Sequence, residues 1–339
     1  MPNRIKLIYF YFIFLISGKN SQKSYEHMRN SYIVYHLWRF FNLICKINSL
    51  VRFKYNIRTS KGIIGELDNN TVKIITDKID KDGFYVFEQI LNEKQVDEIY
   101  RFASTVPLNF SELQEDGSVN DSTIKKTYIE NKNLSNRHQI VDTKDMFKLE
   151  ILSDLFFDEN FLHIANNYFN ARPWVDIFTL WWSNPVSNLP NKYQFNYKDY
   201  SAQMFHYDFD RMKTLKFFIY LTDVDEKNGP HVFVKGSHNK PSFFITKDGR
   251  YDDNLIISKY GDDVIHLKGK KGIIMAVDTR GLHKGMELIE GERLVFQIEF
   301  TNSLFGKMGK KDYTNKVNLN TKNKYKETYS LFVNFSNGK

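Results

Sequence analysis

The sequence predicts a mainly β protein with flanking helices, built as a β-sandwich or barrel. From Trp174 onward the chain consists of short apolar runs separated by Gly, Pro, Asn and Asp, which is typical of many short strands. Before that residue, apolar side chains recur instead at helical spacing in several segments. With 339 residues, 42% of them apolar, the chain can bury a large core, which excludes a disordered or fibrous protein.

The charge is divided unevenly along the chain. Residues 1–60 hold ten Lys/Arg and one acidic residue, and residues 306–339 hold eight and two. The middle, residues 61–305, holds 30 basic and 37 acidic residues, although the whole chain has a net charge of +8. An acidic middle argues against a nucleic-acid partner, because phosphate binding needs Lys and Arg near the site. We therefore expect three regions, with one central domain between two basic ends.

The first region begins with a short apolar run from Leu7 to Ile16 behind Arg4 and Lys6. This run has about half of the roughly 20 residues that a membrane-spanning helix needs. A signal peptide has a similar shape, but no small-residue cleavage pattern follows the run. We therefore expect a helix that packs on the domain.

A second helix is predicted from Ser31 to Lys54. Its apolar residues recur at three- and four-residue steps, which places on one stripe Ile33, Leu37, Phe40, Ile44, Ile47 and Val51. The stripe either packs on the central domain, which we favour, or lies on an anionic membrane surface. The last region, 306–339, is rich in Lys and Asn and is expected to be a loosely packed tail anchored by residues 329–333.

The central region is predicted to start with a turn into a strand at 82–87 and a helix at 93–104, capped by Asn92. A further helix is expected across 151–169. The apolar runs that follow predict strands at 175–182, 215–221, 232–234, 273–277 and 294–300.

Several common catalytic patterns are absent from the sequence. There is no Gly-x4-Gly-Lys-Ser/Thr phosphate loop, no His-Glu-x-x-His and no Gly-x-Ser-x-Gly. The single cysteine, Cys45, excludes a disulfide scaffold and any site made of four thiolates.

A metal-ligand pattern remains in the second half. His206 and Asp208 are two residues apart, so on a strand their side chains point to the same face. His283 follows a buried strand and a turn, from where it can complete a set of two histidines and one carboxylate, which is typical of Fe(II). Arg293 opens an apolar strand ten residues later, where a guanidinium is costly unless it meets an anion.

These residues, with their neighbours, resemble the phytanoyl-CoA dioxygenase family of Fe(II)/2-oxoglutarate oxygenases. The similarity rests on five blocks of sequence, namely 203–208 (QMFHYD), 215–224 (LKFFIYLTDV), 228–231 (NGPH), 236–238 (GSH) and 278–285 (DTRGLHKG), with Arg293 after the last of them. It is close over 175–305 and looser over 82–174. The resemblance implies a double-stranded β-helix, the cupin-like jelly roll, over residues 61–305.

The resemblance also implies roles for individual residues. His206, Asp208 and His283 would bind Fe(II), and Arg293 would bind the distal carboxylate of the co-substrate 2-oxoglutarate. Lys216 is a candidate co-substrate contact, or else a lysine on the solvated face of an edge strand. Gln203 is a weaker co-substrate candidate.

The activity that the resemblance implies is hydroxylation of an unactivated C–H bond in a small molecule, for example an acyl, lipid or glycan-related one, with release of succinate and CO2. Two alternatives stay open, an oxygenase of the same fold that does not use 2-oxoglutarate, and a non-catalytic jelly-roll binding module. We expect a cytoplasmic protein, since 2-oxoglutarate and reduced iron are supplied there, with membrane contact through residues 1–60 as a further candidate. The oligomeric state is not predicted.

Overall fold

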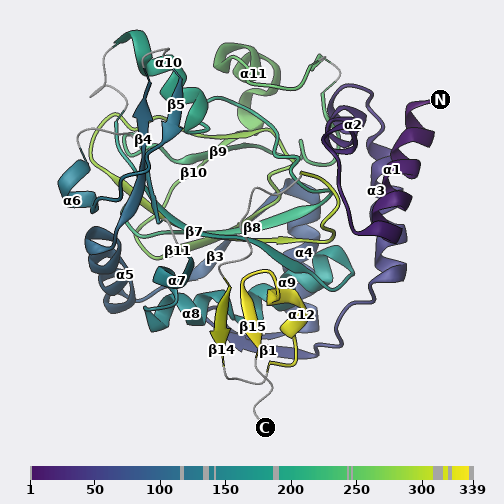
Figure 1. Cartoon of the computed structure of the whole chain (residues 1–339), viewed down its shortest axis with the longest axis horizontal. Helices are drawn as coiled ribbons and strands as arrows, with labels where there is room; N and C mark the ends of the chain where they lie inside the picture. The colour runs from purple at the N-terminus through teal and green to yellow at the C-terminus, as the bar shows by residue number, and fades with distance from the viewer. Residues whose placement is uncertain are drawn as a thin grey trace.

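A computed structural model of the chain describes residues 2–114, 118–132, 137–140, 143–185, 191–242, 244–245, 247–307, 316–319 and 323–335. Two β-sheets face each other in the middle of the molecule, and helices cover the outside (Figure 1). Within the described residues, no helix combines the length and apolar character needed to cross a membrane.

The larger sheet has eight strands in the order β3-β11-β8-β13-β7-β6-β4-β5. Their bounds are β3 (Phe84–Ile90), β4 (Leu108–Leu113), β5 (Val119–Asp121), β6 (Arg137–Ile140), β7 (Trp174–Ser183), β8 (Thr214–Tyr220), β11 (Ile273–Val277) and β13 (Arg293–Thr301). All strand pairs in it are antiparallel. The five strands predicted after Trp174 are therefore observed, four of them in this sheet.

The smaller sheet has the order β10-β9-β12, with β9 (His231–Val234), β10 (Val264–Leu267) and β12 (His283–Gly285). Single bridges continue it, because His206 pairs with His283 and Phe205 pairs with Tyr251. Two antiparallel sheets that face each other across a core form the jelly roll, so the predicted fold class is confirmed.

The central strands of the large sheet are buried on both faces, and alternate side chains along each strand pack into different cores. On β8, Leu215, Phe217 and Ile219 pack into the core on the helical side of the large sheet. Phe218 and Tyr220 point the other way, toward the smaller sheet. A strand buried on both faces reads as a continuous apolar run, which is why β8 could be located from sequence.

Helices cover the outer face of the large sheet. They are α4 (Asn69–Asp82), α5 (Glu93–Thr105), α8 (Glu150–Phe156) and α9 (Glu159–Phe169), and their apolar residues belong to the same core cluster. The single helix expected over 151–169 is in fact two helices. Asp158 separates them, because its carboxylate accepts the backbone N–H groups of Asn160 and Phe161 and so caps α9.

Shorter elements complete this part of the chain. They are the hairpin of β1 (Thr59–Gly62) and β2 (Gly65–Asp68), the helices α6 (Tyr128–Asn131), α7 (Thr143–Met146), α10 (Asn191–Tyr200) and α11 (Asp253–Tyr260), and a 3₁₀ turn (Gly261–Asp263). The C-terminal region contributes α12 (Lys326–Tyr329) and a parallel pair, β14 (Val317–Leu319) and β15 (Val333–Phe335). Tyr329 and Val333 are buried in the main core, as expected for the anchor, whereas 308–315, 320–322 and 336–339 lie outside the described residues.

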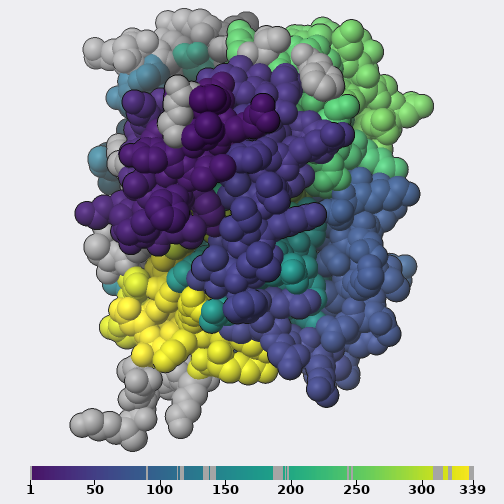
Figure 2. All heavy atoms as spheres, turned by 90° about the vertical axis from the view of Figure 1, so that its right-hand side faces the viewer, coloured from purple at the N-terminus to yellow at the C-terminus, as the bar shows by residue number. Residues whose placement is uncertain are grey.

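The N-terminal region forms three helices, α1 (Asn3–Ser17), α2 (Gln22–Ile33) and α3 (Trp38–Val51), on one side of the molecule (Figures 1 and 2). The start of the helix predicted over 31–54 was therefore wrong, because α2 ends at Ile33 and α3 begins only at Trp38. Between these helices His36 has a positive φ of 52°, which a continuous helix does not allow. The predicted stripe was also partly wrong. Within α3 the buried residues are Phe41, Ile44 and Asn48, while Ile47 and Val51 are exposed.

These helices pack behind the segment that carries the candidate metal ligands. The Tyr32 ring packs at a tilt against Phe209 with ring centroids 4.4 Å apart, and its hydroxyl donates to the His238 carbonyl. Arg29 forms a two-pronged ion pair with Asp248, with Nη2 2.8 Å from Oδ1. Packing on the central domain, the interpretation favoured from sequence, is thus observed for one face of the region.

Candidate metal centre

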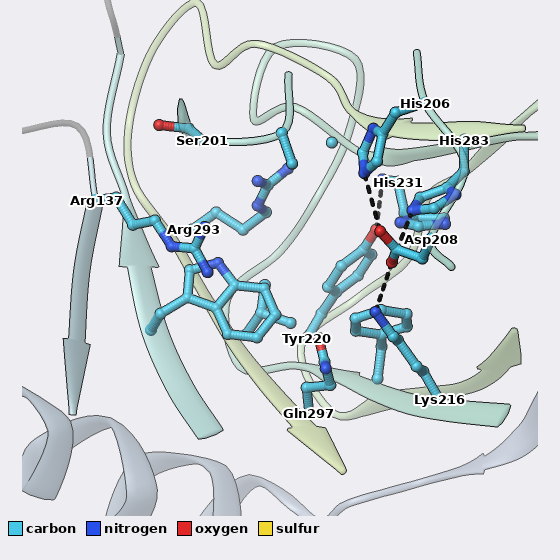
Figure 3. Close-up of a pocket in the computed structure, with 15 residues that line it drawn as sticks. Arg137, Ser201, His206, Asp208, Lys216, Tyr220, His231, His283, Arg293 and Gln297 are labelled. Atoms are coloured by element: carbon cyan, nitrogen blue, oxygen red, sulfur yellow. Dashed lines mark hydrogen bonds and ion pairs between the residues drawn. The ribbon is translucent and has the colours of Figure 1, made fainter. Parts of the chain in front are cut away.

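The three predicted ligands meet between the two sheets. The segments of His206 and His283 are paired by backbone hydrogen bonds of 2.9 and 3.0 Å, and the Asp208 backbone N–H donates to the Thr279 carbonyl at 2.9 Å. One ligand atom of each side chain lies within 4.8 Å of the other two. Each histidine Nε2 is 3.4 Å from a different oxygen of Asp208 (Figure 3). The strand pairing that builds the jelly roll therefore also assembles the ligands.

Backbone carbonyls fix the orientation of both imidazoles. The Nδ1 atom of His206 is 2.8 Å from the Met204 carbonyl, and that of His283 is 2.8 Å from the Gly281 carbonyl. A carbonyl only accepts, so each Nδ1 carries a proton, and Nε2 is the ring nitrogen that faces Asp208. Two imidazole nitrogens and a carboxylate held in this way can bind a divalent metal on one face.

The charge states also suit a cation. Burial, together with the nearby His283, lowers the pKa of His206 to about 4, so this imidazole is neutral at pH 7. Burial alone would raise the pKa of Asp208, but the Lys216 ammonium beside it holds that pKa well below its usual range. The Asp208 carboxylate is therefore ionised while the His206 imidazole is neutral.

Lys216 is buried in the middle of the large sheet and not on a solvated edge. Its ammonium is 2.6 Å from Oδ2 of Asp208 and 3.2 Å from Oε2 of Glu299, which lies directly opposite on β13. Although burial alone would lower the pKa of Lys216, the two carboxylates raise it, so the lysine stays charged. The contact observed for Lys216 is thus with Asp208, a candidate metal ligand, and its contact with a co-substrate stays a prediction.

Arg293 points into the same cavity from the other side (Figure 3). Its side chain is buried, Nη2 donates to Oγ of Ser183 at 3.4 Å, and Nε is buried without a hydrogen-bond partner. Among the described residues no carboxylate forms an ion pair with it, and burial lowers the pKa of its guanidinium. A buried guanidinium in this state has a strong preference for an anionic partner.

The cavity between these groups measures about 170 Å³. Its floor is made of side chains that alternate along two neighbouring strands, Phe218 and Tyr220 on β8 and Val295 and Gln297 on β13. Ser201 and Ala202 lie at one side, just after α10. Gln203 is buried but does not line the cavity, so its role in co-substrate binding stays a prediction.

Several residues of the site were not predicted. Glu299 could have been found by the alternation that leads from Arg293 through Gln297 along one face of β13. Arg137 also lines the cavity, with its guanidinium 5.5 Å from the centre of the Trp181 ring. It comes from β6, a four-residue strand without apolar alternation, so no sequence signal marks it. His231 lines the cavity too and stacks on His283 with ring centroids 5.3 Å apart.

Asp278 caps the turn that leads to His283. Its carboxylate accepts from the Arg280 backbone and guanidinium and from the Tyr168 hydroxyl. The Gly281 carbonyl orients His283.

Comparisons with known proteins agree with the geometry. The family model described as phytanoyl-CoA dioxygenase (PhyH) matches residues 79–287, which is more than half of the chain. A search of curated protein sequences finds no match.

Several solved structures are similar to the chain at low sequence identity. HygX from Streptomyces hygroscopicus, with nickel and 2-oxoglutarate bound, is 13% identical with a TM-score of 0.47, over 76% of this chain and 93% of that one. EctD from S. alaskensis, with bound Fe, is 13% identical with a TM-score of 0.45, over 78% and 85%. The epimerase SnoN of nogalamycin biosynthesis, in complex with Fe3+ and alpha ketoglutarate, is 12% identical with a TM-score of 0.46, over 69% and 84%.

The family match covers β3 to β12 and includes His206, Asp208 and His283. The protein is thus an enzyme of the Fe(II)/2-oxoglutarate-dependent oxygenase superfamily, and within that superfamily the chain belongs to the phytanoyl-CoA dioxygenase (PhyH) family.

Proposed function

We propose that the protein is an Fe(II)- and 2-oxoglutarate-dependent dioxygenase that hydroxylates an unactivated C–H bond of a small molecule and releases succinate and CO2. One observation carries the proposal. Two imidazoles and a carboxylate that are placed to bind a metal line the same cavity as Arg293. The Arg293 guanidinium has no carboxylate partner among the described residues.

In this proposal His206, Asp208 and His283 would hold Fe(II) through two imidazole nitrogens and one carboxylate. The iron, when bound, supplies the activation of dioxygen that is coupled to decarboxylation of 2-oxoglutarate. Some relatives in this family have a small residue in place of the carboxylate ligand and halogenate their substrates. This chain keeps the carboxylate of Asp208, so hydroxylation is the reaction we assign.

The remaining side chains of the cavity position and enclose the co-substrate. Arg293 binds the distal carboxylate of 2-oxoglutarate, for which its planar fork is suited. Lys216 keeps Asp208 ionised and in place through their 2.6 Å contact. Phe218, Tyr220 and Val295 exclude water from the floor of the cavity.

The experiment is an assay of succinate formation by the Fe(II)-loaded enzyme, over acyl, sugar and amino-acid substrates, under ¹⁸O₂. The proposal expects one substrate class to stimulate succinate release and one ¹⁸O atom to appear in its product. An epimerase would release succinate without labelling the organic product, and an oxygenase that does not use 2-oxoglutarate would label it without succinate. A binding module would have no measurable Fe(II) affinity. Each of these three results would contradict the proposal.

A further inference from the structure

The N-terminal helices carry exposed apolar side chains that the oxygenase site does not explain. Of the 20 large hydrophobic residues that are exposed in the described part of the chain, 13 lie between Ile5 and Phe53. We propose that the outward surface of α1 and α3, here called the N-terminal face, docks on the surface of an anionic lipid bilayer.

Helix α1 is apolar on two opposite faces. Its inward face buries Leu7 and Tyr11 in a cluster that includes Phe205 and Phe209 of the ligand-bearing segment. Its outward face exposes residues at three- and four-residue steps, namely Ile5 (48%), Ile8 (48%), Phe12 (58%) and Ile16 (71%). A helix on a water-exposed surface normally presents polar residues on this face, so the outward stripe of α1 indicates a second, apolar environment.

Helix α3 repeats this arrangement. Phe41 and Ile44 are buried on its inward side. The opposite side exposes Leu43 (48%), Ile47 (44%), Leu50 (69%) and Val51 (56%), again at the spacing of one helical stripe. The N-terminal segment that contains both helices lies together on one side of the molecule (Figure 2), and the hydrogen bond between Tyr11 and Asn48 joins α1 to α3.

Polar contacts hold the two helices together and to the domain, so the outward side chains cannot fold inward. The Tyr11 hydroxyl donates to Oδ1 of Asn48 at 2.8 Å, which joins α1 to α3. The side-chain amide of Asn48 in turn donates to the Asn302 carbonyl at 2.8 Å. The face is therefore a fixed surface and not a loose segment.

Positive charge surrounds the apolar stripes. Arg4, Lys6, Lys19, Lys23, Arg39 and Lys46 are exposed, and none of them forms an ion pair in the part of the chain that the structure describes. Glu26 is the single acidic residue among residues 1–60. Unpaired cations around an apolar surface are complementary to anionic headgroups above acyl chains.

A hollow of about 420 Å³ lies where the two helices approach each other. It is lined by Arg4 of α1 and by Trp38, Arg39, Phe40 and Leu43 of α3, with Arg39 over the Trp38 ring at 5.0 Å. Two guanidiniums above an aromatic and aliphatic floor fit a lipid phosphate and its attached chain. A bilayer explains both components of the face, whereas a second copy of the chain would bring the same positive charge and repel it.

The test is sedimentation of the full-length protein with vesicles of phosphatidylcholine alone or with about 30% phosphatidylserine, a composition chosen to give the strong surface potential of anionic membranes. We expect binding to the anionic vesicles that weakens as NaCl is raised. The double variant Phe12→Ser/Leu50→Ser should bind at least roughly tenfold more weakly, because it removes two large inserted side chains. Arg4→Gln/Arg39→Gln should weaken binding roughly 30-fold, at about one phosphate contact per cation.

Matched controls lie on other faces. Ile129→Ser/Ile289→Ser removes two equally exposed side chains (70% and 64%), and Lys94→Gln/Lys125→Gln removes two exposed cations. Both should bind like the parent, and all variants should keep the same circular dichroism melting curve. Absence of binding to anionic vesicles, or equal binding by face and control variants, would overturn the proposal. Vesicle-independent self-association that Phe12→Ser/Leu50→Ser abolishes would assign the face to a second copy and would also overturn it.

Discussion

The ammonium of Lys216 lies 2.6 Å from Oδ2 of Asp208, so one buried cation contacts a candidate metal ligand directly. Glu299 holds the same ammonium from the opposite strand at 3.2 Å. The three groups form a chain of charges between the large sheet and the candidate metal centre, in which one ammonium lies between two carboxylates.

Removal of the lysine alone should therefore destabilise the fold. Lys216→Met leaves Glu299, whose side chain is 3% exposed, as a buried carboxylate without its cation. We expect the free energy of unfolding to fall by about 3 kcal/mol, and Lys216→Met/Glu299→Leu to recover part of that loss. Urea unfolding of both variants and of Glu299→Leu measures this, and a loss in the double variant equal to the sum of the two single losses would show that the two charges are not coupled.

The three ligand residues should each be necessary for metal binding. His206→Ala, Asp208→Ala and His283→Ala remove one ligand each, and we expect Fe(II) affinity to fall more than about 100-fold, beyond the effect of changing an outer partner. His266→Gln is the control, since His266 pairs with Glu226 on the surface. The affinities are measured by anaerobic isothermal titration calorimetry with Fe(II). Unchanged affinity in any of the three alanine variants would remove that residue from the ligand set.

The free energy of unfolding should fall as the pH is lowered from neutral to mildly acidic values, and His238 accounts for part of this pH dependence. This side chain is buried with Nε2 3.0 Å from the Asp80 carbonyl, and burial lowers its pKa from 6.5 to about 4. Between these values the unfolded chain binds a proton that the folded chain does not, so acid favours unfolding.

One such proton corresponds to a slope of about 1.4 kcal/mol per pH unit. The variant His238→Asn should show a slope shallower by up to this amount between pH 6.5 and 5, whatever its absolute stability. Urea unfolding at several pH values provides the measurement, and His266→Gln serves as the exposed control. Parallel slopes for the parent and His238→Asn would mean that His238 does not titrate as inferred.

The strands and the ligand set could be predicted because each depends on local pattern. β8, β11 and β13 are buried on both faces, so each is a continuous apolar run that stands out in the sequence. The His206-x-Asp208 pair follows from the two-residue period of extended chain, and Arg293 follows from the cost of a guanidinium in an apolar strand.

The features that were missed depend on contacts between distant segments. Arg137 enters the cavity because β6 pairs with β7, and nothing near Arg137 in the sequence indicates that pairing. The stripe on α3 was misassigned because the helix has two apolar faces, and periodicity alone does not show which of them meets the domain. Ile47 and Val51 are consequently exposed, although their spacing is that of a buried stripe.

The central claim is that one cavity holds both Fe(II) and the 2-oxoglutarate that Arg293 binds. Its most direct test is anaerobic titration of the Fe(II)-loaded protein with 2-oxoglutarate, followed by visible absorption, in the parent and in Arg293→Leu. The account predicts a metal-to-ligand charge-transfer band that saturates in the parent, and a band that needs at least about tenfold more 2-oxoglutarate in the variant, since a charge-assisted contact is lost. A parent protein that binds Fe(II) but develops no band, or a variant that saturates at the same concentration as the parent, would contradict it.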